Sequence, residues 1–421
     1  MNSLRNNAWT RVPISSVYDE FFDGPHATPK PTNEGPVFLG IKNITEDGKL
    51  DLSDVRHISE EDFPNWTQRV LPQVDDIVFT YEATLNRYAL IPEGFRGCLG
   101  RRLALIRPNF NKVIPRFLHY TFFGADWRRT ISKYTILGST VDRIPLVTFP
   151  AFEIMLLPMT IQRHIVDILA AYDDLIENNT RRIAILEEMA RALYREWFVE
   201  FRFPGHEGVP LVESAVGPVP EGWRLGCIGD VADVLKQGVN PSRLPDETLA
   251  HYSLPAFDAG QLPVYEKGSM IRSNKVLVPP KCVLLSKLNP RIPRVWLPVP
   301  SPDEVSVAST EFLVLTPKQT RGLSYLFSLL NSDVFQREFG AHALGTSTSH
   351  QRVSQTGFLQ MPLAIPSPQL IAAFDDLVDP LLRLRHTMRL RNRNLLRTRD
   401  FLLPKLVSGD VALSAPGEMD S

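Results

Sequence analysis

The chain has 421 residues, of which 43% are hydrophobic and 22% are charged, and this length predicts two to three globular domains. No apolar run approaches the roughly 18 residues that would indicate a membrane-spanning helix. The 46 basic and 47 acidic residues nearly cancel, which counts against a simple, strongly basic nucleic-acid-binding domain.

The first block, 1–157, has many Pro and Gly residues and short apolar runs such as Ile77-Val78-Phe79, which predict an irregular α+β domain. An aromatic stretch predicts one short helix over 116–127. The segment 87–143 has eleven basic and three acidic residues, and the polar loop 138–143 lies at its end. Hydroxyl and guanidinium groups suit contacts with phosphates and base edges, although ordinary solvated loops contain the same residues. The candidate nucleic-acid contacts in this block are Arg87, Arg101, Arg102, Ser139, Thr140 and Arg143.

A long helix is predicted over 158–203, where Pro204-Gly205 would end it. Apolar residues recur at gaps of three and four, with one four-residue stutter, and form a heptad seam. The seam consists of residues 161, 165, 168, 172, 175, 179, 183, 186, 190, 193 and 197, and Asn179 is its only polar member.

The second block, 204–365, has the same character as the first and predicts a second α+β domain, with a short helix over 323–335. Residues 267–294 include seven basic residues and no acidic one, and a Gly-Thr-Ser loop follows at 345–352. The candidate contacts in this block are Lys287, Asn289, Arg291, Arg294, Thr346, Ser347, Gln351 and Arg352.

A second long helix is predicted over 366–410, beginning at Ser367-Pro368, and residues 411–421 are expected to be a disordered tail. Its expected seam runs through 370, 374, 377, 381, 384, 388, 391, 395, 398 and 402, with Arg391 and Thr398 as polar members. Each long helix would span roughly 60 Å and needs a partner for its apolar stripe. We expect the two helices to pair as an antiparallel coiled coil. The alternative is that each packs on its own domain.

The two blocks are copies of one pattern. From residue 72 onward, positions in the first half match positions in the second at an offset of roughly 206–209 residues, as for Gly138 with Gly345 and Pro158 with Pro366. Before residue 40 the offset is roughly 214, as for Trp9 with Trp223. A chain with two such domains has two equivalent surfaces, which suggests that it recognises two similar things.

No catalytic pattern is evident. A GxxxxGK[ST] loop and a GxGxxG after a strand are both absent, and Asn289-Pro290-Arg291 lacks the second proline and aromatic residue of the adenine methyltransferase motif. The nine histidines do not cluster, and Cys98, Cys227 and Cys282 lie far apart, so we expect no metal or cofactor. The cysteines and the lack of a secretory signal indicate a cytoplasmic protein. A stand-alone DNA methyltransferase or nuclease with unrecognised motifs, and a DNA-free protein adaptor with two faces, remain alternatives.

The chain resembles the specificity subunits of bacterial type I restriction–modification systems over nearly its full length. The C-terminal stretch 398–410, TRDFLLPKLVSGD, is similar to the family's closing motif. The segment from Leu186 to Gly205, the Gly222-Trp223 pair and the loop 345–352 are also typical.

This resemblance implies two target recognition domains joined by two helices that form an antiparallel coiled coil. Each domain would read one half of a bipartite, asymmetric DNA site, and the helices would set the spacing. It further implies that the chain itself is not an enzyme. Methyltransferase subunits, expected to number two, would dock on the helices, and restriction subunits would complete the complex.

Overall fold

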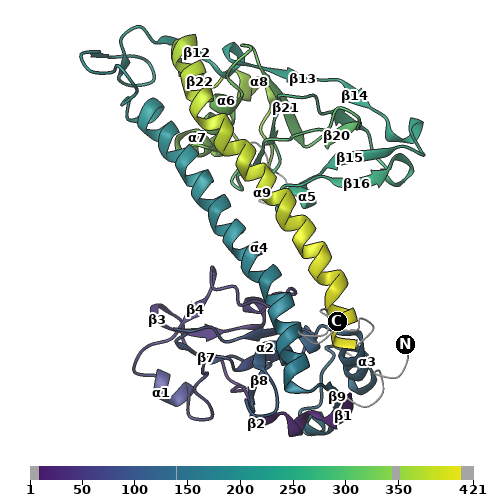
Figure 1. Cartoon of the computed structure of the whole chain (residues 1–421). Coiled ribbons are helices and arrows are strands. Elements are labelled where there is room, and N and C mark those ends of the chain that lie inside the picture. The colour runs from purple at the N-terminus through teal and green to yellow at the C-terminus, as the bar shows by residue number, and fades with distance from the viewer. Residues whose placement is uncertain (1–8, 139, 344–350, 409–421) are drawn as a thin grey trace, which may run out of the picture. The chain divides into compact units, whose positions relative to one another are not determined.

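The computed structural model describes residues 9–138, 140–343 and 351–408, and the chain divides into two compact units. Unit 1 contains residues up to 175 together with residues from 395 onward, and unit 2 contains residues 176–394. Each unit is α+β, as expected, and the two long helices contribute residues to both (Figure 1). The predicted disordered tail, 411–421, and the last two residues of the predicted helix 366–410 lie outside the described residues.

Unit 1 is built on a four-stranded antiparallel sheet in the order β2-β8-β5-β6. A second sheet, β4-β3-β7, contains the parallel pair β3 and β7, and β1 pairs with β9. The central strands are continuous apolar runs because both of their faces are buried: all four residues of β5 are buried. The elements are β1 Thr10–Pro13, β2 Tyr18–Asp23, β3 Thr32–Leu39, β4 Arg56–His57, α1 Phe63–Trp66, β5 Ile77–Thr80, β6 Tyr88–Leu90, β7 Gly97–Leu99, β8 Leu103–Pro108, α2 Pro115–Thr121, α3 Ala125–Tyr134 and β9 Glu153–Leu156.

Unit 2 has the same plan. Its antiparallel sheet has the order β13-β21-β18-β19, its second sheet has the order β14-β17-β20-β15-β16 with β15 and β20 parallel, and β12 pairs with β22. The elements are β10 Leu211–Val212, β11 Val219–Pro220, β12 Arg224–Cys227, β13 Ala232–Leu235, β14 Gly238–Val239, β15 Thr248–Tyr252, α5 Leu254–Asp258, β16 Val264–Lys267, β17 Lys275–Leu277, β18 Val283–Ser286, β19 Val295–Trp296, β20 Ser306–Ser309, β21 Phe312–Pro317, α6 Leu323–Asn331, α7 Asp333–Ala341, α8 Gln355–Leu359 and β22 Pro362–Ile365.

The internal repeat is therefore confirmed at the level of topology. The order β2-β8-β5-β6 in unit 1 corresponds strand by strand to β13-β21-β18-β19 in unit 2. The parallel pair β3 and β7 corresponds to β15 and β20. Unit 2 differs mainly in the size of this second sheet, where β14 and β17 are added, while β16 takes the place of β4 as the antiparallel neighbour of the parallel pair. This is the region where the two sequence offsets change.

The single short helix predicted in each block is wrong in both. The stretch 116–127 contains nearly all of α2 and the start of α3, and residues 122–124 separate the two helices. The stretch 323–335 contains α6 and the start of α7, and the Ser332 hydroxyl between them accepts a hydrogen bond from the Phe335 N–H. Apolar residues continue at helical spacing across both breaks, so the sequence pattern did not reveal that each stretch contains two helices. A serine cap restarts the second helix of the pair.

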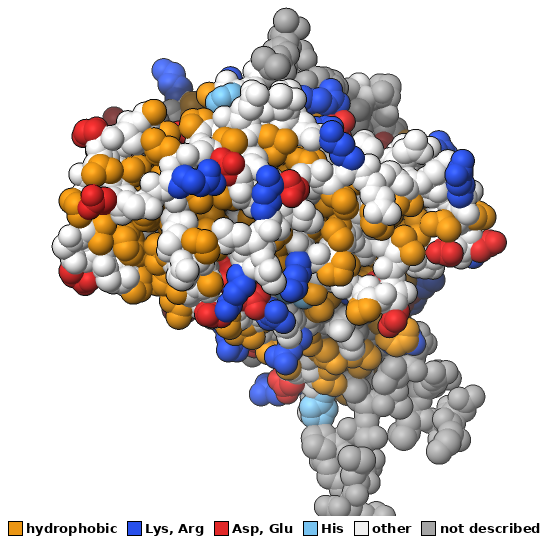
Figure 2. All heavy atoms as spheres, turned by 90° about the horizontal axis from the view of Figure 1, so that it is seen from above, with side chains coloured by type: hydrophobic (Ala, Val, Ile, Leu, Met, Phe, Trp, Pro, Cys, Tyr) orange, Lys and Arg blue, Asp and Glu red, His pale blue; other side chains and the backbone are white. Residues whose placement is uncertain are grey.

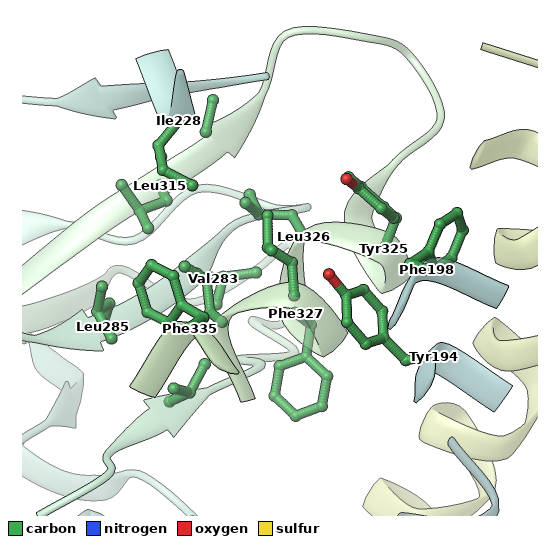
Figure 3. Packing of buried hydrophobic residues seen from close by; sticks show 14 of the residues in the cluster. Tyr194, Phe198, Ile228, Val283, Leu285, Leu315, Tyr325, Leu326, Phe327 and Phe335 are labelled. Atoms are coloured by element: carbon green, nitrogen blue, oxygen red, sulfur yellow. The ribbon is translucent and has the colours of Figure 1, made fainter. Parts of the chain in front are cut away.

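The two long helices are α4, Met159–Tyr194, and α9, Pro368–Ser408. The first ends earlier than predicted, because a π-helical turn at Arg195–Val199 follows Tyr194. In unit 2 the end of this segment belongs to the core: Figure 3 shows Tyr194 and Phe198 beside Tyr325 of α6, with ring centroids 6.1 and 5.0 Å from the Tyr325 ring.

In unit 1 the end of α9 takes the corresponding place. Leu403, Leu406 and Val407 join the core formed by the sheet, α2 and α3, together with Ile165 and Leu169 from the start of α4. The core of each unit is thus completed by the beginning of one long helix and the end of the other.

The antiparallel pairing of the helices is confirmed within each unit. In unit 1 the Arg399 guanidinium of α9 donates to the Asp173 carboxylate of α4 at 2.7 Å. In unit 2 the Asn179 side-chain amide donates to Asn392 Oδ1 at 2.9 Å. Asn392 in turn donates to the Thr180 hydroxyl at 3.1 Å. Polar contacts at buried positions fix the register of such helices.

A second polar cluster lies further along the pair in unit 2. The Glu187 carboxylate accepts hydrogen bonds from Arg389 at 2.6 Å and from Arg385 at 3.5 Å. The Arg389 guanidinium also donates to the Gln261 side chain at 2.7 Å, so the cluster joins α4 and α9 to the loop between α5 and β16. Burial, with Arg389 close by, lowers the pKa of Arg385 to about 9.

The predicted seams are shifted by about one residue over part of each helix. In α4, Gln162, Leu169 and Ile176 are buried in place of the expected Ile161, Ile168 and Leu175. In α9, Leu377 and Leu384 are 50% and 40% exposed, and the expected polar members Arg391 and Thr398 are also exposed. The polar residues of α9 that bond to α4 include Arg385, Arg389, Asn392 and Arg399.

Candidate nucleic-acid interface

In unit 2 the fold joins two polar stretches that are about 60 residues apart in the sequence. The β18–β19 connection, which begins at Lys287, is held against the segment that starts at Gln351. The Asn289 N–H donates to the Gln351 carbonyl at 2.8 Å, and the Val353 N–H donates to the Lys287 carbonyl at 3.1 Å. These bonds place the candidates Lys287, Asn289, Gln351 and Arg352 in one site.

The candidates in this site differ in how free their side chains are. Arg294 forms a two-point ion pair with Asp258 at 2.8 and 2.9 Å and is only 14% exposed. Arg352 forms a similar pair with Glu311, whose pKa is lowered by that hydrogen bond. Arg291 is exposed, and no ion pair involves it within the described residues. Arg291 is therefore more available to an incoming ligand than Arg294.

The backbone of Asn289 adopts a left-handed conformation with a φ of 49°. Asparagine tolerates this conformation better than most residues, because its short polar side chain causes little steric conflict. Asn289-Pro290 forms a tight turn at the centre of the site. Asn289, which was compared with a methyltransferase motif, therefore shapes the backbone of this turn.

In unit 1 the corresponding site forms around Glu82. A backbone bridge joins Glu82 to Arg143, and the Glu82 carboxylate lies 2.8 Å from Nε of Arg102. Arg143 is exposed and forms no ion pair with any described residue, and Thr140 is also exposed. Arg87 lies elsewhere: it binds Glu46 at 3.0 Å and the Ile44 carbonyl at 3.2 Å. The fold therefore brings Arg102 and Arg143 together but not Arg87.

The two sites share a backbone arrangement, but one position is basic in unit 1 and acidic in unit 2. Arg143 in unit 1 and Arg352 in unit 2 make equivalent bridges, with Glu82 and Leu288 respectively. The residue before β8 is Arg102, whereas the residue before the equivalent strand β21 is Glu311. In unit 2 this acid neutralises Arg352, while in unit 1 the arginine at that position pairs with Glu82. The same framework therefore presents different chemistry.

Three candidates, Ser139, Thr346 and Ser347, lie outside the described residues. Two basic residues that the sequence did not single out, Lys42 and Arg56, lie beside Arg101 and Arg102 around a hollow of about 390 Å³ in unit 1. Lys42 and Arg56 are far in sequence from the β7–β8 loop that carries Arg101 and Arg102, so only the fold could show that these four residues lie together.

On the face seen in Figure 2, Lys and Arg side chains stand among acidic and apolar ones without forming a continuous basic field. No group of three or more His, Cys, Asp and Glu side chains among residues 9–138, 140–343 and 351–408 could hold a metal ion. The described helices also include none that is both long and apolar enough to cross a membrane.

Known proteins are similar to this chain in sequence and fold. Residues 31–188 match the model of the type I restriction modification DNA specificity domain. The type I restriction enzyme MjaIX specificity subunit of Methanocaldococcus jannaschii is 26% identical over 197 residues, which are 45% of this chain and 42% of that protein. The chain thus matches less than half the length of that relative.

A longer match is to the type I restriction enzyme HindI specificity subunit of Haemophilus influenzae, which is 21% identical over 89% of this chain and 94% of that protein. The crystal structure of a type I restriction–modification S subunit from M. genitalium has the same fold, with a TM-score of 0.57 and 15% identity over 96% of this chain and 97% of that one. Together with the repeated domains and the paired helices, these similarities show that the chain resembles the specificity subunits of type I restriction–modification systems.

Proposed function

We propose that this chain is the DNA sequence-recognition subunit of a type I restriction–modification complex. One observation carries the proposal: a single topology occurs twice, and equivalent loops carry different side chains at the same place, as for Arg102 and Glu311. Two frames of one shape suit two segments of double-stranded DNA. Different side chains within those frames suit different bases, because base identity is read by hydrogen-bonding groups.

We assign one half of a bipartite, asymmetric site to each globular domain, with the domains taken as 1–157 and 204–365. The segments 158–203 and 366–410 would then be the spacer. Supporting this role, polar contacts such as Asn179 with Asn392 fix the register of the helices.

The chemistry is assigned to other subunits. Exposed apolar side chains stand on the helices of unit 2: Ile185 and Met189 on α4 are 58% and 46% exposed, and Leu377 and Leu384 are 50% and 40% exposed. A protein partner would cover such side chains. We propose methyltransferase subunits as these partners, with restriction subunits completing the complex. A subunit of this kind acts in the cytoplasm, where bacterial DNA lies.

The proposal is tested by reconstituting the chain with type I modification subunits from its own organism and sequencing the methylated DNA. We expect methylated adenines in a motif with two specified parts and an unspecified gap. Methyl transfer by the chain alone, or a single continuous motif, would contradict the proposal.

Single substitutions then assign the half-sites. Arg143→Ala in unit 1 and Arg291→Ala in unit 2 each remove an exposed guanidinium from one site. Each should weaken binding by about 1–3 kcal/mol and relax one position of one half-site only, if it contacts a base. Lys318→Ala is the matched control, because Lys318 follows the opposite end of β21 and pairs with Asp233. Relaxation of both half-sites by one substitution would exclude the division of labour.

A further inference from the structure

The hollow in unit 1 lies where three segments of the chain meet. Its wall is formed by the turn after β3, by β4, and by the loop between β7 and β8, and its volume is about 390 Å³. The residues around it are Thr28, Phe38, Gly40, Ile41, Lys42, Asn43, Arg56, Arg101 and Arg102. Four of these nine are basic, and none is acidic.

The positive charge in the hollow is only partly neutralised from outside it. Lys42 binds Asp54 at 2.5 Å, and Arg102 lies 2.8 Å from Glu82. Arg56 and Arg101 are exposed, and no ion pair joins either of them to a described residue. Two guanidinium groups therefore remain available at the rim. Guanidinium forks match the oxygen geometry of phosphate groups and bind them at two points.

The frame that carries these cations is rigid. Asn43 is 2% exposed; its side-chain oxygen accepts a hydrogen bond from the Gly40 N–H at 2.9 Å, and its amide donates to the Asp51 and Asp54 carbonyls at 3.0 and 3.1 Å. A Cβ on Gly100 would lie 2.0 Å from the Leu39 carbonyl, so the β7–β8 loop packs directly on the end of β3. The hollow is formed before any ligand arrives, which lowers the entropic cost of binding.

We propose that this hollow binds a backbone phosphate of the DNA target through Arg56 and Arg101, with Lys42 and Arg102 adding positive potential. This inference rests on the proposed function, since that function supplies the DNA. A phosphate fits better than a base: Phe38, the aromatic residue in the wall, is only 6% exposed and offers no face for stacking. The contact would position the first domain without reading sequence.

The second repeat lacks three of the four basic side chains at the corresponding places. By the strand correspondence, Thr310 occupies the place of Arg101, Glu311 that of Arg102, and Ala256 that of Lys42. The phosphate contact would therefore belong to the first domain alone. The two half-sites would then differ in their dependence on salt as well as in sequence.

The test uses the complex reconstituted with its modification subunits and the double variant Arg56→Gln with Arg101→Gln. Both side chains are exposed, so the variant is expected to fold. The slope of log affinity against log salt should fall by roughly 0.9, because one backbone phosphate is no longer neutralised. The recognised sequence should stay the same. Arg129→Gln, which removes an arginine that is 75% exposed on α3, is the control and should leave the slope unchanged.

A set of DNA duplexes, each with one neutral methylphosphonate, locates the contact. In the unaltered complex we expect one position beside the first half-site to weaken binding, and in the double variant that position should lose its effect. Equal salt slopes for variant and wild type, or the same methylphosphonate profile in both, would overturn the proposal. So would loss of inorganic phosphate binding, at matched ionic strength, without any change in DNA binding. If the wild-type complex does not prefer its methylated motif over random DNA, the proposed function fails instead.

Discussion

Glu187→Gln provides a strong test of how the long helices are held together in unit 2. The carboxylate is shared by Arg385 and Arg389, whose side chains are 4% and 13% exposed. Glutamine has nearly the same shape but no charge, so both guanidinium groups would stay buried without a counter-ion. Removing one member of a buried ion pair costs about 3–5 kcal/mol. Because the Glu187 side chain is 30% exposed, water partly compensates, and we expect a loss of about 3 kcal/mol.

The assay is urea unfolding followed by circular dichroism and tryptophan fluorescence. The midpoint should fall with little change in the m-value, which would assign the effect to the folded state. Arg383→Gln is the control: it breaks an exposed pair with Asp379, in which the arginine is 78% exposed, and should cost less than about 0.5 kcal/mol.

A second substitution separates charge from packing. Arg385 lies over the Phe327 ring, with 4.8 Å from its guanidinium carbon to the ring centroid, and methionine would keep an apolar contact there. Adding Arg385→Met to Glu187→Gln should recover much of the lost stability, because one stranded charge is removed. If Glu187→Gln costs less than about 1 kcal/mol, or if the double variant is no more stable than the single one, the argument from buried charge is refuted.

Two further predictions concern buried polar groups. Burial lowers the pKa of His119, which is 8% exposed, to about 4. In the unfolded chain His119 is protonated below about pH 6.5, whereas in the folded chain it stays neutral down to about pH 4. The free energy of unfolding should therefore fall by up to about 3 kcal/mol as the pH drops from 6.5 to 4. His119→Phe should flatten this slope in urea titrations at several pH values, and an unchanged slope would exclude His119 as the cause. Asn392→Ala should cost about 1–3 kcal/mol in thermal unfolding, because Asn179, 5% exposed, loses its partner. Leucine at both positions should restore much of that loss, and failure to do so would point to a different role for the pair.

Apolar spacing predicted that two long helices exist and pair, but not which face of each helix is buried. The assumed seams followed leucine and isoleucine, so Leu377 and Leu384 were placed inside although both are substantially exposed. The buried line instead includes Arg385 and Arg399, whose charges are matched by acids on α4. A buried arginine looks like a surface residue in a sequence, because its counter-ion lies about 200 residues away.

The repeat predicted the site better than composition did. Matching the two halves aligned Gly138 with Gly345, and the structure places Arg143 and Arg352, at the ends of the loops that follow, in equivalent backbone bridges. Composition directed the choice to basic residues in two acid-poor stretches, and two of those chosen, Arg87 and Arg294, are engaged in ion pairs. Composition also missed Arg56, which lies at the hollow in unit 1 on the two-residue strand β4, outside the acid-poor stretches. Side-chain availability depends on distant partners, which spacing does not show.

The short strand pairs β1 with β9 and β12 with β22 have an evolutionary consequence. They hold the two ends of each globular domain opposite each other, as with Thr10 opposite Leu156 and Arg224 opposite Ile365. Everything between those ends is an insertion with adjacent attachment points. A single recombination event could exchange one domain for another of different sequence and leave the helices untouched. New DNA specificities can then arise in one step, as new combinations of existing halves.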